Sequence, residues 1–173
     1  INCCGLANFG PALSLSEAAE NALWQVNYQA PIRLIKQVAE RNCKIRLVQL
    51  SSLAALCPHP YLAAYSASKA ALQTYCLALQ EELSLKGSEM RVCLYILGPV
   101  RTAIFPPELQ DALGGAKLQM GPEISARRII GLLQQGRSYA IVGKRYRLLA
   151  WLMKLLPQRW IIRLIGAYLR KGL

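Results

Sequence analysis

The chain has 173 residues, of which 54% are hydrophobic and 17% are charged, and this composition predicts a single globular domain rather than a disordered or low-complexity segment. Its one histidine, His59, excludes most zinc and iron sites, which need several histidine or cysteine ligands. The formal net charge of +12 is unevenly distributed, because residues 127–173 contain 11 basic side chains and no acidic one.

The first 41 residues predict a short strand followed by a long helix. Residues 1–5 are too few to assign alone, but a strand there would extend the alternation that follows. A helical stretch runs from about Ser16 to Arg41, where Ser16 or Ser14 can cap the first turn and Glu17 and Glu20 favour the positive end of the helix dipole. Because proline has no main-chain N–H, we expect Pro31 to bend this helix.

The middle of the chain predicts a strand, a helix and a second strand. Residues 45–50 are apolar and are followed by two serines, which is typical of a buried strand. Residues 64–86 are rich in Ala, Leu, Gln and Glu and stop at Gly87, which predicts a helix that ends at a glycine. Residues 91–97 predict a second buried strand.

The last elements complete an alternating pattern. A loop at 102–122 precedes a predicted helix at 123–135, a short strand near 139–142 and a basic, apolar C-terminal segment. Strands that alternate with long helices are typical of a parallel sheet with helices on both faces. We therefore predict an α/β fold with a doubly wound parallel sheet.

Three polar residues near the first long strand are candidates for chemistry. Tyr65 and Lys69 are four residues apart on the predicted helix, so their side chains share one face and the ammonium can approach the phenol. Ser52 follows the strand at its carboxyl end, where ligands bind in open parallel sheets. The Tyr/Lys spacing alone is close to chance, and each residue also has an ordinary structural explanation, so the surrounding segments must decide.

These surrounding segments resemble the short-chain dehydrogenase/reductase family. The family's catalytic segment is similar in residues and spacing to Val48-Gln49-Leu50-Ser51-Ser52 and Tyr65-Ser66-Ala67-Ser68-Lys69-Ala70-Ala71. Three further segments align in the expected order: Asn2-Cys3-Cys4-Gly5, Val26-Asn27 and Gly98-Pro99-Val100-Arg101-Thr102. The resemblance covers roughly residues 1–143 and implies a Rossmann-type domain.

The resemblance implies hydride transfer between NAD or NADP and an alcohol or carbonyl compound. Tyr65 would be the catalytic acid or base, with Lys69 lowering its pKa and holding the nicotinamide ribose. Ser52 would orient the substrate oxygen, and Asn27 would position a water through its main chain and link Lys69 to solvent. The cofactor-binding residues that the family pattern implies are Asn2, Gly5, Tyr65, Lys69, Gly98, Val100 and Thr102. Asn27 as a surface residue and Thr102 as a cap remain the structural alternatives.

The sequence also departs from the family pattern. Cys3 stands where a second asparagine is usual, and Leu97 stands where a proline is usual. The strand, Gly-rich turn and helix that hold the cofactor pyrophosphate have no counterpart in residues 1–173. We therefore expect a C-terminal two thirds of a longer oxidoreductase, inactive as a fragment alone and with an exposed sheet edge.

The substrate side is predicted from the loop at 103–121, which takes the place of the family's variable substrate lid. Its apolar residues are Phe105, Leu109, Leu113, Leu118 and Met120. They favour an apolar alcohol or carbonyl substrate. The alternative is that they pack a small helix onto the body of the domain.

We expect residues 144–173 to form a helical extension beside the domain at 1–143. This extension mixes basic residues with leucine, isoleucine and tryptophan, and Pro157 divides it into two short helices. Helices of this composition lie in the surface of anionic membranes. Packing on a partner subunit is the alternative, and the high apolar share argues against nucleic acid as a partner.

Six cysteines with no Cys-x-x-Cys spacing predict free thiols in a reducing, cytoplasmic compartment, and we expect Cys43, Cys57, Cys76 and Cys93 to be buried. No apolar stretch is long enough for a transmembrane helix, and no signal peptide is visible. Family members commonly pair through the helices that match 17–41 and 64–86, so a homo-oligomer is expected. The rival interpretations are a non-catalytic binding module and a scaffold associated with a membrane surface.

Overall fold

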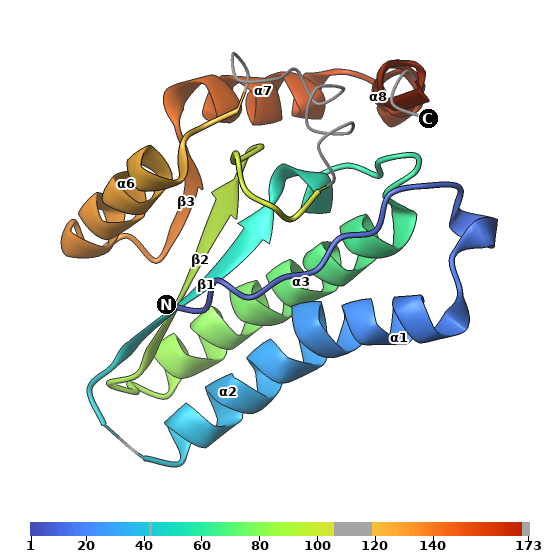
Figure 1. Ribbon diagram of the computed structural model, residues 1–173. Coiled ribbons are helices and arrows are strands. Elements are labelled where there is room, and N and C mark those ends of the chain that lie inside the picture. Colours follow the sequence, from blue (N-terminus) through green and yellow to red (C-terminus); the bar gives the residue numbers. More distant parts are fainter. Residues whose placement is uncertain (42, 106–118, 171–173) are drawn as a thin grey trace.

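The centre of the computed structural model, which describes all residues except 42, 106–118 and 171–173, is a parallel sheet (Figure 1). Its strands are β1 (Arg46–Ser52), β2 (Arg91–Leu97) and β3 (Tyr139–Val142), in the spatial order β1-β2-β3. In the register, Arg46 is opposite Arg91 and Leu94 is opposite Tyr139. On the other edge of β1, Asn2 forms a single parallel bridge with Gln49, so the start of the chain extends the sheet by one pair.

Helices connect and cover these strands. The helical elements are η1 (Ala12–Ser14), α1 (Glu17–Trp24), η2 (Gln25–Gln29), α2 (Ala30–Ala39), η3 (Leu53–Ala55), α3 (Ala63–Leu85), α6 (Pro122–Gln134), α7 (Lys144–Leu155) and α8 (Gln158–Leu169). The predicted α/β class with a parallel sheet is confirmed. Two predicted helix ends also hold: the Ser16 hydroxyl accepts from Ala19 N, and Gly87 follows α3 with φ 61°, a conformation that favours glycine.

The two faces of the sheet carry two separate cores. Alternate residues of a strand point to opposite faces, so Leu47 and Val92 pack with α2 and α3, whereas Val48 and Cys93 pack with α6 and α7. Figure 1 shows α2 and α3 on one side of the strands and α6 on the other. The same view shows α7 lying across the carboxyl ends of the strands, where a ligand site is expected, and α8 following to one side.

Just before Pro31, where the sequence predicted a bend, the long N-terminal helix contains a π-helical segment, η2. Residues 25–29 make the wider turns, and Ala30 N donates to Gln25 O five residues back. We attribute the π-helical turns to Pro31. A proline has no main-chain N–H and so cannot donate the α-helical hydrogen bond to the carbonyl of Asn27, four residues earlier. The helix therefore widens before the proline and continues beyond it as α2.

The cysteines are all free, but they are not all buried. Cys57, Cys76 and Cys93 are buried as predicted, and burial raises the pKa of the Cys76 thiol to about 12. Cys43 is exposed, contrary to the prediction, because it lies in the connection between α2 and β1. The apolar residues that follow Cys43 in the sequence therefore do not bury its thiol.

The C-terminal helices are joined closely to the domain. Tyr146 and Ala150 of α7 belong to the core on the α6 face of the sheet, and Gly166 of α8 touches Pro60 in the loop before α3. Of the predicted lid at 103–121, residues 106–118 lie outside the described residues. Within the described ranges, no helix is both long and apolar enough to cross a bilayer.

Candidate active site

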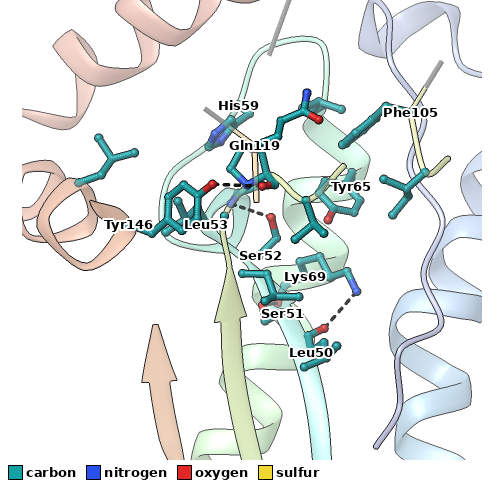
Figure 2. A pocket seen from close by; sticks show the side chains of 18 of the residues that line it. Leu50, Ser51, Ser52, Leu53, His59, Tyr65, Lys69, Phe105, Gln119 and Tyr146 are labelled. Atoms are coloured by element: carbon teal, nitrogen blue, oxygen red, sulfur yellow. Dashed lines mark hydrogen bonds between the residues drawn. The ribbon is translucent and has the colours of Figure 1, made fainter. Parts of the chain in front are cut away.

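A pocket of about 810 Å³ lies at the carboxyl ends of β1 and β2, with α7 and α8 forming part of its wall (Figure 2). Among the sequence-predicted residues, those that line it are Gly5, Ser52, Tyr65, Lys69, Gly98, Val100 and Thr102. The two remaining predicted residues, Asn2 and Asn27, do not line it; their hydrogen bonds hold the segments that do. Four of the segments quoted for the family resemblance, which are far apart in the sequence, therefore meet at one cavity, and Val26-Asn27 is the exception.

Tyr65 and Ser52 line this pocket, and their side chains are hydrogen-bonded to each other. Ser52 ends β1, and its hydroxyl accepts from Ala54 N at 3.2 Å, which caps η3 and fixes the serine in place. Tyr65 lies in the first turn of α3, is 7% exposed and meets the ring of Phe105 edge to face at 6.0 Å. Burial raises the pKa of the Tyr65 phenol, and its hydrogen bond with Ser52 acts in the opposite direction. The phenol is therefore protonated at neutral pH.

Lys69 lies one helical turn after Tyr65 and is 6% exposed. Its Nζ donates to Leu50 O at 3.2 Å (Figure 2), and burial lowers its pKa to about 8, with Cys4 acting in the opposite direction. The sequence predicted that Lys69 would lower the pKa of Tyr65. Burial is the largest influence on the phenol and raises the pKa of Tyr65, and the contribution of Lys69 to the acidity of Tyr65 stays a prediction.

Two buried serines hold the first turns of α3 against their surroundings. The Ser51 hydroxyl donates to Lys69 O at 3.3 Å, and the Ser68 hydroxyl donates to Tyr65 O at 2.8 Å. Both serines are buried, so these hydrogen bonds are shielded from water. The backbone that carries Tyr65 and Lys69 is thus fixed from the β1 side and within its own helix.

Asn27, in η2, has no exposed surface and connects three segments. Its side-chain amide donates to Leu6 O at 2.8 Å and to Ser68 Oγ at 3.1 Å, and its Oδ1 accepts from Leu6 N at 2.9 Å. These bonds hold residues 5 and 6 beside α3. A Cβ at Gly5 would lie 3.4 Å from Lys69 Nζ and 3.5 Å from Asn27 Oδ1, so the glycine leaves space next to the ammonium. The water-positioning role of the Asn27 main chain stays a prediction.

Asn2 supports the first wall of the pocket instead of lining it. Its main-chain N donates to Val48 O at 2.8 Å, and its side-chain amide donates to Gln49 Oε1 at 2.8 Å. Its Oδ1 accepts from Cys4 N at 3.2 Å, which turns the chain toward Gly5. Asn2 therefore sets the course of residues 3–5, which do line the pocket.

Sequence reasoning missed Tyr146 as a pocket residue. Its hydroxyl donates to Pro99 O at 3.1 Å, and its ring lies so close to Gly98 that a Cβ there would be 2.5 Å from three ring atoms. The ring therefore covers the turn after β2 and requires a glycine at 98. No local signal predicts this contact, because the two residues are 48 positions apart.

His59 also lines the pocket, although the sequence suggested only a loop residue. Its Nδ1 lies 2.7 Å from Cys57 O, and because a carbonyl oxygen can only accept, Nδ1 carries the proton. Burial is the largest influence on the ring and lowers its pKa, so the imidazole is neutral at pH 7 and Nε2 is an acceptor. Its place in the loop after the carboxyl end of β1 is the signal that could have identified it.

Comparison with known proteins gives consistent results. A family model described as short chain dehydrogenase matches residues 1–112. A short-chain dehydrogenase of Penicillium crustosum is 27% identical over 180 aligned positions, which cover 91% of this chain and 65% of that protein. An NADPH-dependent 3-dehydrocapnine reductase of Ornithobacterium rhinotracheale is 30% identical over 112 positions, which cover 61% of this chain and 39% of that protein.

A similar fold is found among solved structures. The crystal structure of a short chain dehydrogenase from Burkholderia cenocepacia in complex with NADP matches with a TM-score of 0.75 at 22% identity, covering 95% of this chain and 67% of that one. The chain spans between 39% and 65% of the length of the two curated relatives described above.

Proposed function

Since the chain belongs to the short-chain dehydrogenase family, we propose that it carries the catalytic residues of an oxidoreductase that uses NAD or NADP to interconvert an apolar alcohol and its carbonyl compound. The observation that supports this most directly is the grouping of Ser52, Tyr65 and Lys69 in the wall of one pocket at the carboxyl ends of β1 and β2. A phenol, a hydroxyl that bonds to it and a nearby ammonium are the groups that proton transfer to a carbonyl oxygen requires.

The residues present fit part of a nicotinamide cofactor. Gly5 leaves open space beside Lys69 Nζ that a larger residue would fill. Among the described residues, the hydrogen bond of Lys69 Nζ goes to Leu50 O, and an ammonium has three donors, so further donors remain for ribose hydroxyls. Gly98, Val100 and Thr102 would line the nicotinamide side of the same cavity. When bound, the cofactor supplies or accepts the hydride.

In this proposal the protein's own residues manage the proton and the substrate oxygen. The Ser52 hydroxyl donates to the substrate oxygen and holds it near the phenol, and the Tyr65 hydroxyl gives its proton to that oxygen as negative charge develops there. At neutral pH the Tyr65 phenol carries its proton, as the acid in carbonyl reduction must. Lys69 balances the charge left on the tyrosine oxygen once the proton has gone.

The substrate class follows from the rest of the lining. Leu53 and Phe105 flank the catalytic side, and Leu149, Met153 and Ile165 belong to the α7 and α8 side of the same pocket. A cavity with mostly aliphatic and aromatic walls and a few polar groups at one end suits an apolar molecule with a single oxygen function. His59 Nε2 adds an acceptor that could bind a second substrate hydroxyl.

The test is oxidation of NADH and NADPH by the full-length protein with long-chain aldehydes and cyclic ketones, followed by absorbance. Tyr65→Phe removes only the proton donor, and we expect kcat to fall by roughly 100-fold or more. Tyr75→Phe is the matched control, because it removes the same hydroxyl from the same helix outside the pocket. Full activity of Tyr65→Phe would contradict the proposed role. Cofactor binding with no turnover on any carbonyl would favour the non-catalytic binding module.

A further inference from the structure

Helices α7 and α8 expose large apolar side chains that the domain core does not use. On α7, Leu148, Trp151 and Leu155 recur at intervals of three and four residues and so share one side of the helix. On α8, Trp160 and Leu164 are also four residues apart, and they are 66% and 65% exposed. We call these five side chains, with the basic residues described next, the α7–α8 surface. Soluble proteins rarely leave such a group of tryptophans and leucines uncovered.

The charge of this surface has one sign. Its basic members, all exposed, are Arg147, Lys154, Arg159, Arg163 and Arg170. On α8, Arg159 and Arg163 are four residues apart and Arg170 follows seven later, so the three form one basic strip along the helix. Residues 127–173 contain no acidic side chain, so nothing on these helices neutralises the strip. The partner of the α7–α8 surface must therefore be both apolar and negatively charged.

The same helices form part of the pocket wall. On these helices and in the turn between them, the large apolar residues that both line the pocket and are exposed are Leu149, Leu152, Leu156, Leu164 and Tyr168. Figure 1 shows α7 beyond the carboxyl ends of the strands, with α8 following to one side of it. Leu164 belongs both to the pocket lining and to the α7–α8 surface, so whatever covers these helices also adjoins the pocket.

We propose that the α7–α8 surface docks on an anionic lipid bilayer, with Trp151 and Trp160 in the headgroup region and the arginines on the lipid phosphates. Tryptophan prefers the membrane interface, and basic residues near an anionic membrane each add binding energy. A second copy of this surface is a poorer partner, because pairing two such faces would bring like charges together. Nucleic acid would use the arginines but leave the leucines and tryptophans in water.

The test is flotation of the full-length protein with vesicles of phosphatidylcholine alone or mixed with phosphatidylserine. We expect binding to the mixed vesicles that weakens as salt is added. The triple variant Arg159→Gln/Arg163→Gln/Arg170→Gln should bind roughly 100-fold more weakly, from about a factor of five for each basic residue removed. The double variant Trp151→Ser/Trp160→Ser should lose binding to the same vesicles.

The matched control removes three exposed charges elsewhere. Lys36, Arg41 and Lys86 lie at or after the ends of α2 and α3, at the opposite end of the strands from α7 (Figure 1), so their replacement by Gln should leave vesicle binding unchanged. Equal losses in the two triple variants would overturn the proposal, as would absence of binding to the mixed vesicles. If Trp151→Ser/Trp160→Ser instead turned an oligomer into a monomer in light scattering, the surface would be a subunit interface and the proposal would be wrong.

Discussion

A single methyl group at position 98 should destabilise the protein, because the Tyr146 ring already occupies the space. In Gly98→Ala the new Cβ would lie 2.5 Å from Cδ1, Cε1 and Cζ of that ring, whereas ordinary contacts begin at 3.4 Å. The ring would have to move by about an ångström out of a nearly fully buried site, which costs about 1–3 kcal/mol. That movement also strains the hydrogen bond to Pro99 O, worth about 1 kcal/mol. We expect a loss of about 2–4 kcal/mol and a Tm lower by roughly 5–15 °C.

Urea and thermal unfolding followed by circular dichroism measure this loss, and a double-mutant cycle identifies its cause. In a Tyr146→Ala background the methyl group has no ring to meet, so Gly98→Ala should then be close to neutral. Gly131→Ala is the control: this glycine lies inside α6 with no atom near its absent Cβ, so the change should stabilise by about 0.5–1 kcal/mol. If Gly98→Ala cost the same with and without the Tyr146 ring, the steric explanation would be refuted.

Two further predictions concern the groups behind the pocket. Asn27→Ala should lower the free energy of unfolding by about 3 kcal/mol, because Leu6 N, Leu6 O and Ser68 Oγ lose a buried partner, while Asn21→Ala on the exposed side of α1 should change it little. Equal effects of the two changes in urea unfolding would contradict this. Because burial lowers the pKa of Lys69 to about 8 from 10.5, the unfolded chain holds its proton to higher pH, and the stability attributable to Lys69 rises between pH 8 and 10.5. Lys69→Met should therefore exceed the wild type in stability most near pH 8 and least near pH 10.5, and a difference that stays constant with pH would be the contrary result.

The strands and helices were predictable because their signals are local. The apolar run that became β1, the Ala-rich run that became α3 and the glycine at 87 each fix their element through neighbouring residues alone. The meeting of Ser52, Tyr65 and Lys69 was also predictable, since strand ends and a helix face place them at the same edge of a parallel sheet. The family pattern, rather than the spacing of any one pair, made this prediction specific.

What the sequence did not predict depends on contacts between distant segments. Tyr146 reaches the Gly98 turn only because α7 crosses the sheet, and His59 lines the pocket only because its loop folds over the end of β1. The rise in the pKa of Tyr65 was not predicted either, because the sequence shows that Lys69 is near but not how deeply the phenol is buried. Likewise, Pro31 was recognised as a disturbance, but its effect on the hydrogen bonds one turn earlier was not.

The bonds of Asn27 also bear on the order in which the chain assembles. Residues 2–6 are fixed by partners 21 and 47 positions later in the chain, through Asn27 and Gln49, and by few contacts of their own. Closing such a long loop costs conformational entropy, and the hydrogen bonds that offset this cost form only once Asn27 and Gln49 are in place. We therefore expect residues 2–6 to dock only after β1 and η2 are in place, and to detach before the sheet opens. Fast amide hydrogen exchange at Leu6, relative to Val48 in the sheet, would be its signature.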